Sequence, residues 1–194
     1  MKKKIAITGG IGSGKSSVLR ILEEMGYPIF SCDEIYRQIV HMPAYIQKIE
    51  QIFPSCVSEG MIDKKALSNL VFGDEKKLAL LNEVAHPLIM SQLLKKMDKC
   101  VEEVIFAEVP LLFEGNYENL FDKVIVVTRN LEERIKSVME RDKISEEEVQ
   151  KRISSQFDFE DKKNENRLKN CDVIFLKNEE DLSALKNKIT QLIF

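Results

Sequence analysis

The chain has 194 residues, of which 44% are hydrophobic and 31% are charged, and its formal net charge is −3. This composition is ordinary for a soluble globular protein with one well-buried core and room for a small appended domain. The charge argues against a general affinity for nucleic acid, and no stretch approaches the ~18 apolar residues of a membrane span. Four widely spaced cysteines without a C-x-x-C pair support neither a zinc site nor a disulfide framework, which predicts a cytoplasmic protein.

The first predicted element is a buried strand over residues 5–8, and a glycine-rich loop follows it at once. The loop, Gly9-Gly10-Ile11-Gly12-Ser13-Gly14-Lys15-Ser16, fits the phosphate-binding pattern G-x-x-x-x-G-K-[ST]. A helix is predicted after it, so inward-pointing backbone N–H groups form an anion site at a helix N-terminus. Lys15 then reaches the β- and γ-phosphates of ATP, and the Ser16 hydroxyl binds Mg²⁺. The nucleotide site is predicted at Gly10, Ile11, Gly12, Ser13, Gly14, Lys15, Ser16 and Ser17.

A second short strand is predicted over residues 28–31, and Asp33 follows it. Ligands of an open α/β sheet lie beyond the carboxyl ends of its strands, so Asp33 is expected in the same crevice as the loop. A carboxylate there accepts the proton of a hydroxyl that attacks the γ-phosphate, which predicts a catalytic base. Aspartate is also a good helix N-cap, and this structural role stays open as the alternative for Asp33.

The pattern changes between residues 43 and 100, where helix-like segments follow one another and no strand is obvious. The longest predicted helix runs from about Asp74 to Cys100, with Pro87 as a kink or boundary. His86 stands beside this proline, and its spacing alone favours a packed or capping residue over a ligand. We predict a helical insert over 43–100, between segments of a nucleotide-binding core formed by 1–42, 101–128 and 168–194.

The third and fourth strands are predicted over residues 104–107 and 124–127, and Glu108 directly follows the third. An acid in this place is the usual second group that organises Mg²⁺, either directly or through water. The alternative is a surface carboxylate at a strand end. The direction of Glu114 is open, because Pro110 and a loop intervene.

Basic residues gather after the fourth strand, and they are Arg129, Arg134, Arg141, Arg152 and Arg167. Charged runs on helices are mostly solvated faces. Phosphoryl transfer nevertheless needs cations against the equatorial oxygens, and a mobile flap brings them. Arg141, at the end of a helix predicted over 130–141, is therefore the first candidate for the ATP phosphates, and Arg152 is the second.

The remaining elements complete the predicted fold. Ser145 and Glu148 form a capping box for a helix over 146–155, and the charged segment 157–170 is expected to be exposed and mobile. A fifth strand over 173–176 precedes a terminal helix. Alternating strands and helices predict an α/β protein with the three-layer P-loop NTPase fold, about five mostly parallel strands, the helical insert and a helical lid over 129–167.

Several motifs taken together resemble the dephospho-CoA kinase family. They are the loop preceded by Thr8, Cys32-Asp33-Glu34-Ile35, Gly60-Met61-Ile62-Asp63, Val71-Phe72, His86-Pro87-Leu88-Ile89, Pro110-Leu111-Leu112-Phe113-Glu114, and Arg141-Asp142 followed by Ser145 to Glu148, Arg152 and Gln156. Many families share the phosphate loop, but its coincidence with the His-Pro and Pro-Leu-Leu-Phe-Glu elements is specific. The resemblance runs from Ile5 to about Asn178.

The resemblance implies transfer of the γ-phosphoryl group of ATP to the ribose 3′-hydroxyl of dephospho-CoA. Asp33 would be the base, while Lys15, Ser16 and Mg²⁺ would hold ATP. The segment from Arg141 to Gln156 would close as a lid. The acceptor would be held by Asp33, His86, Pro87, Pro110, Leu111, Leu112 and Glu114.

Three positions depart from the family pattern. An arginine often precedes Arg141 on the same helix, where this chain has Ser137. Lys64 replaces an arginine that follows the Ile-Asp pair, which keeps the charge but loses the planar fork. The asparagine after the fifth strand, Asn178, comes one place late.

Two other functions compete with this interpretation. A kinase of the same architecture that acts on a nucleoside or nucleoside monophosphate would share everything up to Asp33 and differ in the insert. A nucleotide-binding regulatory module would bind without turnover. The sequence lacks an N-K-x-D guanine element, and Gly115 is its last glycine, so neither a GTPase nor an ABC-type ATPase is supported.

Overall fold

The computed structural model describes residues 2–71, 73–178 and 181–193, so Phe72 of the Val71-Phe72 motif lies outside the described residues. The chain forms two compact units. We call Met1–Phe30 with Cys100–Phe194 the sheet unit and Ser31–Lys99 the helical unit. The helical unit therefore begins at Ser31, earlier than the expected insert boundary at residue 43.

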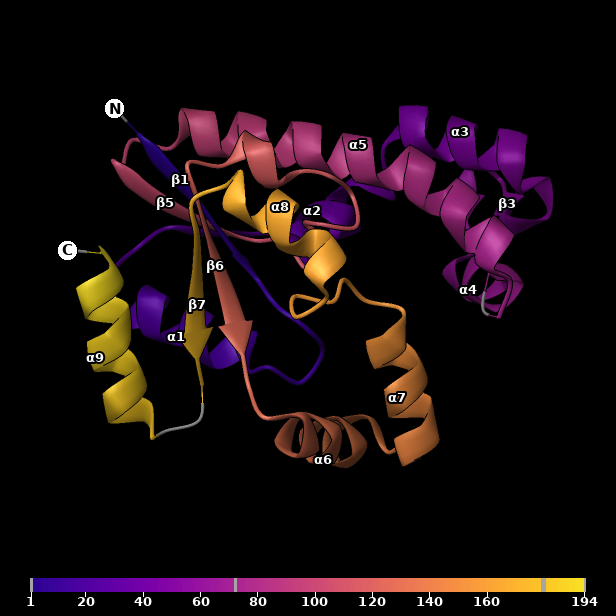
Figure 1. Ribbon diagram of the computed structural model, residues 1–194. Helices are drawn as coiled ribbons and strands as arrows, with labels where there is room; N and C mark the ends of the chain where they lie inside the picture. Colours follow the sequence, from indigo (N-terminus) through magenta and orange to yellow (C-terminus); the bar gives the residue numbers. More distant parts are fainter. Residues whose placement is uncertain (1, 72, 179–180, 194) are drawn as a thin grey trace. The chain divides into compact units, whose positions relative to one another are not determined.

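The sheet unit is built on a five-stranded sheet with the order β2-β5-β1-β6-β7 (Figure 1). Its strands are β1 (Lys3–Thr8), β2 (Ile29–Ser31), β5 (Val104–Glu108), β6 (Lys123–Thr128) and β7 (Val173–Lys177). β1 pairs in parallel with β5 and β6, and β6 pairs in parallel with β7, which confirms the predicted α/β class. β5 separates β1 from β2, so the strand before Asp33 is not a direct neighbour of the strand that leads into the glycine loop.

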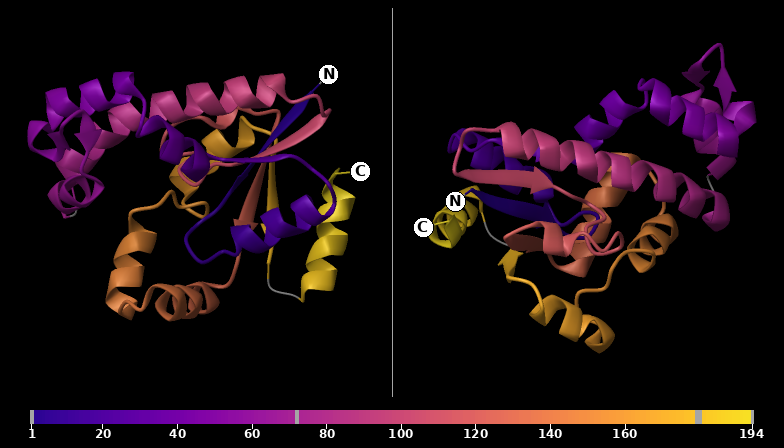
Figure 2. Two further views of the ribbon diagram at one scale, coloured as in Figure 1. Left: turned by 180° about the vertical axis from the view of Figure 1, so that it is seen from behind. Right: turned by 90° about the horizontal axis from the view of Figure 1, so that it is seen from above.

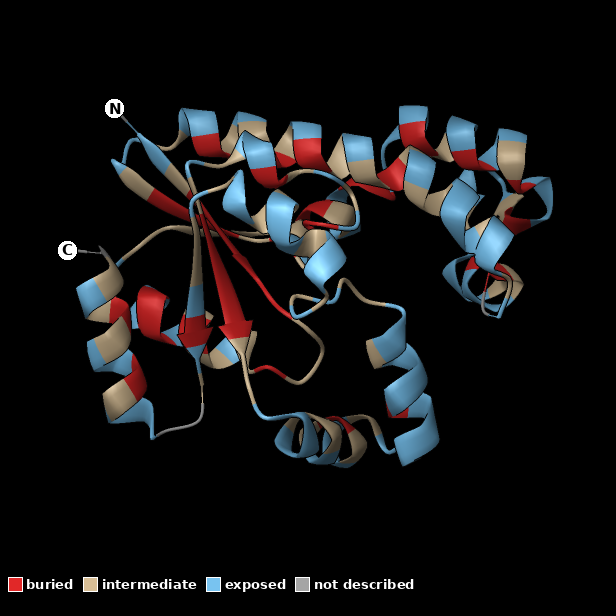
Figure 3. Cartoon of the chain, viewed as in Figure 1, coloured by how far each residue is buried: buried red, intermediate tan, exposed pale blue. Residues whose placement is uncertain are grey.

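Helices α1 (Lys15–Glu24) and α9 (Leu182–Ile193) lie side by side against one face of this sheet (Figures 1 and 2). The apolar side of α1 packs into the main core, and its buried residues are Val18, Ile21 and Leu22. The core continues through Phe106 of β5 and Leu185 of α9. Figure 3 shows this burial concentrated along the strands and the inward sides of the helices. Because α1 is fixed by its packed side, the loop that opens it is held at the end of β1.

The segment after helix α7 (Glu146–Ser154) is more structured than the sequence suggests. It forms a 3₁₀ turn (Lys162–Asn164) and helix α8 (Glu165–Lys169). The Phe113 ring stacks on Phe157 at 4.7 Å between centroids and meets the edge of Phe159 at 5.4 Å. No residue of 157–170 is buried, which agrees with the expected exposure, and two phenylalanines nevertheless attach this charged stretch to the sheet unit.

Arg167 of α8 completes this attachment. Its guanidinium lies over the rings of Phe113 and Phe157, at 5.5 and 5.3 Å from their centroids. It also donates to the carboxylate of Glu118, which is only 4% exposed, and to the carbonyl oxygen of Phe113. A buried carboxylate needs such a partner, so Arg167 serves the structure of the segment.

The helical unit contains α2 (Cys32–Ile39), α3 (Pro43–Ile52), α4 (Lys64–Val71) and α5 (Glu75–Lys99). Helices α2 and α5 pack together, and the Lys96 ammonium donates to the Gln38 carboxamide at 2.7 Å. The largest fully buried side chains of this unit are Tyr45, Ile35, Ile39, Ile49, Leu93 and Met97. Within the described residues of the whole chain, no helix is both long and apolar enough to cross a membrane.

The helical unit differs from the sequence-based expectations in two places. After a 3₁₀ turn (Pro54–Cys56), it contains an antiparallel hairpin of β3 (Val57–Ser58) and β4 (Met61–Ile62). Glu59 and Gly60 have φ angles of 52° and 71°, and such a two-residue turn joins adjacent antiparallel strands. Helix α5 also continues through Pro87, so the boundary that was one of the two expected alternatives is absent, while the kink stays a prediction. Buried residues on both sides of the proline hold the helix together, so packing overrides the local preference.

Candidate active site

The glycine loop joins β1 to α1 through a backbone that only glycine allows at several positions. Gly9, Gly12 and Gly14 have φ angles of 142°, 76° and 87°. A Cβ on Gly9 would lie 2.2 Å from the Val127 carbonyl oxygen, and one on Gly12 would lie 2.7 Å from that of Arg134. Both the positive φ and the close neighbours therefore exclude side chains, which leaves the concave amide surface that an anion needs.

The backbone of Ile11 is held at both its N–H and its carbonyl oxygen. Its N–H donates to the Gln156 carboxamide at 2.8 Å, and its carbonyl oxygen accepts from Arg134 Nε at 3.0 Å. The Asn178 carboxamide donates to the Ser13 carbonyl oxygen at 3.0 Å. Side chains from α6 (Leu131–Asp142) and from the residues that follow α7 and β7 thus fix the loop.

These three loop contacts were not predicted, because more than a hundred residues separate the partners in sequence. Gln156 and Asn178 carried a signal, since both belong to the elements that resemble the family. Asn178 comes one place late in the sequence, yet its own N–H pairs with the Thr128 carbonyl oxygen at 2.8 Å. Nothing in the sequence distinguished Arg134 from the other four arginines that follow the fourth strand.

The Lys15 ammonium interacts electrostatically with several other charged side chains of the sheet unit. It donates to the carbonyl oxygens of Gly9 at 2.7 Å and Gly10 at 3.2 Å. Burial lowers its pKa below the ordinary value, and the Glu108 carboxylate opposes this by raising the pKa. Arg134 and Arg141 lower the pKa further, and Glu114 raises it. The structure therefore brings the predicted residues Lys15, Glu108, Arg141 and Glu114 into one electrostatic neighbourhood.

Two side chains, those of Glu108 and Ser16, carry the oxygen ligands that suit Mg²⁺. Glu108 ends β5 opposite Ile7 of β1, and Ser16 is exposed in the first turn of α1. The described residues contain no cluster of three or more His, Cys, Asp or Glu side chains that could hold a metal. Mg²⁺ usually keeps several waters and binds through one or two protein groups plus substrate phosphates. One hydroxyl and one carboxylate beside a phosphate loop fit that coordination.

A buried hydroxyl in the loop also fits an anionic ligand. Ser13 is only 1% exposed, and in the described part of the chain its Oγ has no hydrogen-bond partner. A buried polar atom without a partner is costly unless a ligand or water pairs with it.

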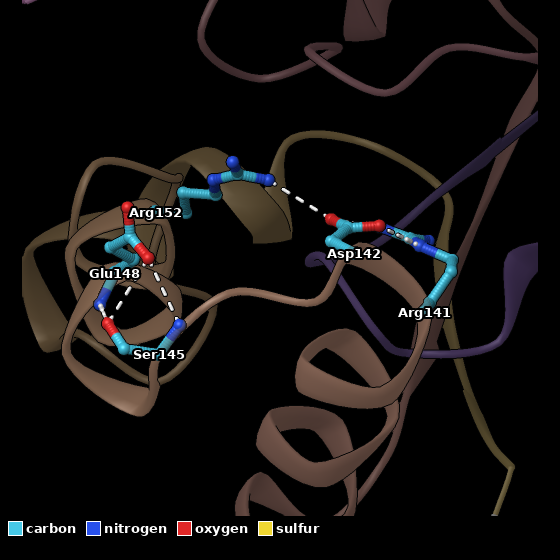
Figure 4. A network of polar contacts seen from close by, with 5 residues as sticks. All are labelled: Arg141, Asp142, Ser145, Glu148 and Arg152. Atoms are coloured by element: carbon cyan, nitrogen blue, oxygen red, sulfur yellow. Dashed lines mark hydrogen bonds and ion pairs between the residues drawn. The ribbon is translucent and has the colours of Figure 1, made fainter.

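The predicted lid arginines meet at a shared carboxylate (Figure 4). Arg141 Nε donates to Asp142 at 2.6 Å, and Arg152 Nη1 donates to the same side chain at 3.1 Å. These contacts join the end of α6 to α7. The hydrogen bond from Arg141, supported by Arg152, holds the pKa of the Asp142 carboxyl below its ordinary value. The predicted capping box of Ser145 and Glu148 is confirmed at the start of α7.

The loop from Pro110 to Glu114 divides into inward and outward residues. Leu112 and Phe113 are fully buried, whereas 37% of Leu111 is exposed. The Glu114 carboxylate accepts the backbone N–H of Phe157 at 2.8 Å. Leu112 therefore packs in the unit, while Leu111 is open to a ligand and Glu114 links this loop to the end of the lid.

The remaining predicted residues belong to the helical unit. Asp33 is exposed in the first turn of α2, and its N–H donates to Ser31 Oγ at 3.3 Å. Ser31 is therefore the N-cap of α2, and the alternative role of Asp33 as the cap is wrong. His86 is half-buried and Pro87 exposed on α5. Lys64, which departs from the family pattern, opens α4.

A parallel sheet, a G-x-x-x-x-G-K-S loop that opens α1 and an arginine-bearing helical segment together define a P-loop kinase. The family described as dephospho-CoA kinase matches residues 3–183. The chain belongs to the dephospho-CoA kinase family. A dephospho-CoA kinase of Fusobacterium nucleatum is 35% identical over 187 residues, which cover 95% of this chain and 94% of that protein.

Two solved structures are similar to this chain over almost its whole length. A protein from Thermus thermophilus is 32% identical with a TM-score of 0.79, and the match covers 99% of this chain and 96% of that one. A dephospho-CoA kinase from Campylobacter jejuni is 29% identical with a TM-score of 0.62, over the same shares of the two chains.

Proposed function

We propose that this chain transfers the γ-phosphoryl group of ATP to the ribose 3′-hydroxyl of dephospho-CoA, giving ADP and coenzyme A. The observation that carries this proposal is the complete phosphate loop with Lys15, in a chain that matches dephospho-CoA kinases over almost its whole length. We further propose that it acts in the cytoplasm, since its four cysteines are widely spaced in the sequence and form no C-x-x-C pair.

On the donor side, the loop amides would bind the phosphates of ATP and the Lys15 ammonium would move to the β- and γ-phosphates. Lys15 now bonds to two loop carbonyl oxygens, so its charge already lies at the loop. Ser16 and Glu108 are the residues that would hold Mg²⁺. The ion would neutralise charge that develops on the phosphates.

On the acceptor side, Asp33 would take the proton of the ribose hydroxyl. The hydroxyl oxygen forms a bond to the γ-phosphorus, the bond from this phosphorus to the β–γ bridging oxygen breaks, and ADP leaves with that oxygen. An exposed carboxylate that does not cap its helix is available for this role. His86, Pro87, Pro110 and Leu111 would hold the acceptor, and the Arg141 guanidinium would stabilise charge on the transferred group.

The test is ADP release with dephospho-CoA, nucleosides and nucleoside monophosphates as separate acceptors. We expect turnover with dephospho-CoA, and a product whose new phosphate is located on the ribose 3′-oxygen by ¹H and ³¹P NMR. Turnover confined to nucleosides or their monophosphates would identify the competing kinase function. ATP binding without turnover of any acceptor would favour a regulatory module.

A further inference from the structure

The arginine that lies on the phosphate loop is Arg134, which is the fourth residue of α6. Its Nε donates to the Ile11 carbonyl oxygen at 3.0 Å. A Cβ on Gly10 would lie 2.3 Å from Arg134 Nη2 and 2.9 Å from Cζ, so the guanidinium rests directly against the Gly10 backbone. The absence of a side chain on Gly10 is therefore what makes room for this cation.

The position of Arg134 on the loop can be related to the phosphates through Lys15. The Lys15 ammonium, which acts at the β- and γ-phosphates in P-loop proteins, lies 3.2 Å from the Gly10 carbonyl oxygen. Arg134 contacts the same glycine and lowers the pKa of Lys15, as a neighbouring positive charge does. Two cations therefore lie at the same end of the loop.

The other groups around Arg134 do not remove its charge. Partial burial lowers the pKa of its guanidinium, and the Glu160 carboxylate opposes that change by raising the pKa. An arginine stays protonated in proteins at neutral pH under such shifts. Its Nε faces the loop carbonyl oxygen, and a guanidinium has further N–H donors on its two terminal nitrogens.

We propose that Arg134 is a nucleotide-binding residue that contacts the β- and γ-phosphates of ATP beside Lys15. It lies three residues before Ser137, where the family often has an arginine, and residues three apart share one side of a helix. Arg134 thus supplies, one helical turn earlier, a cation that this helix lacks at residue 137. The proposal rests on the kinase function for its ligand, ATP, but not on the identity of the acceptor.

The experiment measures binding of AMP-PNP and AMP by calorimetry, without an acceptor, to wild type, Arg134→Met, Arg134→Lys and Lys136→Gln. Methionine keeps an apolar stem against Gly10 and loses the charge. Lys136 is exposed on the same helix, so its variant removes one positive charge away from the loop. We expect Arg134→Met to weaken AMP-PNP binding about 10- to 100-fold, the range of one charge-assisted hydrogen bond. Arg134→Lys should lose less, because it keeps a point charge.

AMP distinguishes a phosphate contact from a general packing role. We expect AMP binding to change no more in Arg134→Met than in Lys136→Gln, because AMP lacks the β- and γ-phosphates. Equal losses for AMP and AMP-PNP, or wild-type AMP-PNP binding by Arg134→Met, would overturn the proposal. Should Arg134→Met fail to fold in a thermal melt, wild-type AMP-PNP affinity in Arg134→Gln would overturn it in the same way. Failure of wild type to bind AMP-PNP would instead count against the kinase function.

Discussion

At the scale of single residues, the phosphate loop depends on glycines for two separable reasons. One is the positive φ angle, which costs an L-residue energy wherever it occurs. The other is crowding, since neighbouring atoms occupy the places where side chains would stand at Gly9, Gly10, Gly12 and Gly14. The chain offers a natural comparison in Gly26, which has a φ of 85° but no atom within 4 Å of a Cβ.

Gly12→Ala and Gly26→Ala should therefore behave differently. In both variants an alanine must adopt a positive φ angle, which lowers the free energy of unfolding by about 1 kcal/mol. Only Gly12→Ala must also displace the Arg134 backbone, so we expect it to lose ATP affinity as well. Urea denaturation and calorimetric titration with AMP-PNP measure the two effects. Equal AMP-PNP affinity of the two variants would contradict the crowding argument.

Residue types at the loop were predictable, because the amide nest, the lysine and the hydroxyl follow from a contiguous pattern. The side chains that hold the loop in place were not, because Arg134, Gln156 and Asn178 reach it from other elements. An aspartate after a strand can act as a helix cap or as a base, and the structure shows that Ser31 caps α2 in place of Asp33.

At the scale of elements, the lid helices are joined by polar contacts at their ends. Lys143, with a φ of 56°, ends α6 in the left-handed region, and Ser145 starts α7 with a reciprocal capping box. Between them, Asp142 receives both candidate arginines (Figure 4). The position of Arg141 therefore depends on a short turn whose geometry the cap defines.

Ser145→Ala should loosen the start of α7. Loss of a serine N-cap costs about 0.5–2 kcal/mol of helix stability. We expect faster amide exchange in residues 146–150, measured by hydrogen–deuterium exchange, while β1 and α1 keep wild-type protection. Ser154→Ala at the other end of α7 removes a hydroxyl that donates to the Lys151 carbonyl oxygen of the same helix, and serves as the control. Equal protection of α7 in the two variants would count against the cap.

The capping box also makes the start of α7 sensitive to acid. The N–H and hydroxyl of Ser145 donate to Glu148, and these bonds lower the pKa of the Glu148 carboxyl below its ordinary value of 4.5. A lowered carboxyl pKa stabilises the fold above the ordinary value, and this stabilisation is lost as the pH falls through the lowered pKa. ¹³C NMR titration of Glu148 should give a pKa below 4.5 in wild type and a higher one in Ser145→Ala. An identical titration in both would show that the Ser145 hydroxyl does not lower this pKa, since the backbone N–H of residue 145 remains in the alanine variant.

At the scale of the whole molecule, the residues proposed to bind ATP and those proposed to bind the acceptor fall largely into different units. The sheet unit contains the loop, Glu108 and the lid arginines, while the helical unit contains Asp33, His86 and α5. The sequence predicts strands and long helices well here, because their apolar patterns are strong. It missed the β3–β4 hairpin, whose strands have two residues each, and the anchoring of 157–170 by aromatic contacts across the sheet unit.

If the two substrates bind to different units, each should protect a different part of the chain from amide exchange. AMP-PNP alone should slow amide exchange in residues 9–17, and dephospho-CoA alone should slow it in the unit 31–99. Both together should protect 141–156 more than either does, because a lid closes over the complete set of substrates. Protection by dephospho-CoA that is confined to the sheet unit would contradict the assignment of the acceptor site.

The most direct test of the account is the turnover and ATP affinity of Asp33→Asn. Asparagine keeps the size of the side chain but cannot accept the proton of the ribose hydroxyl. We predict a fall in kcat of about 10²- to 10⁴-fold, the usual contribution of a general base, with unchanged affinity for AMP-PNP. Lys15→Ala should lose both turnover and affinity. Wild-type kcat in Asp33→Asn would contradict the claim that this carboxylate deprotonates the acceptor.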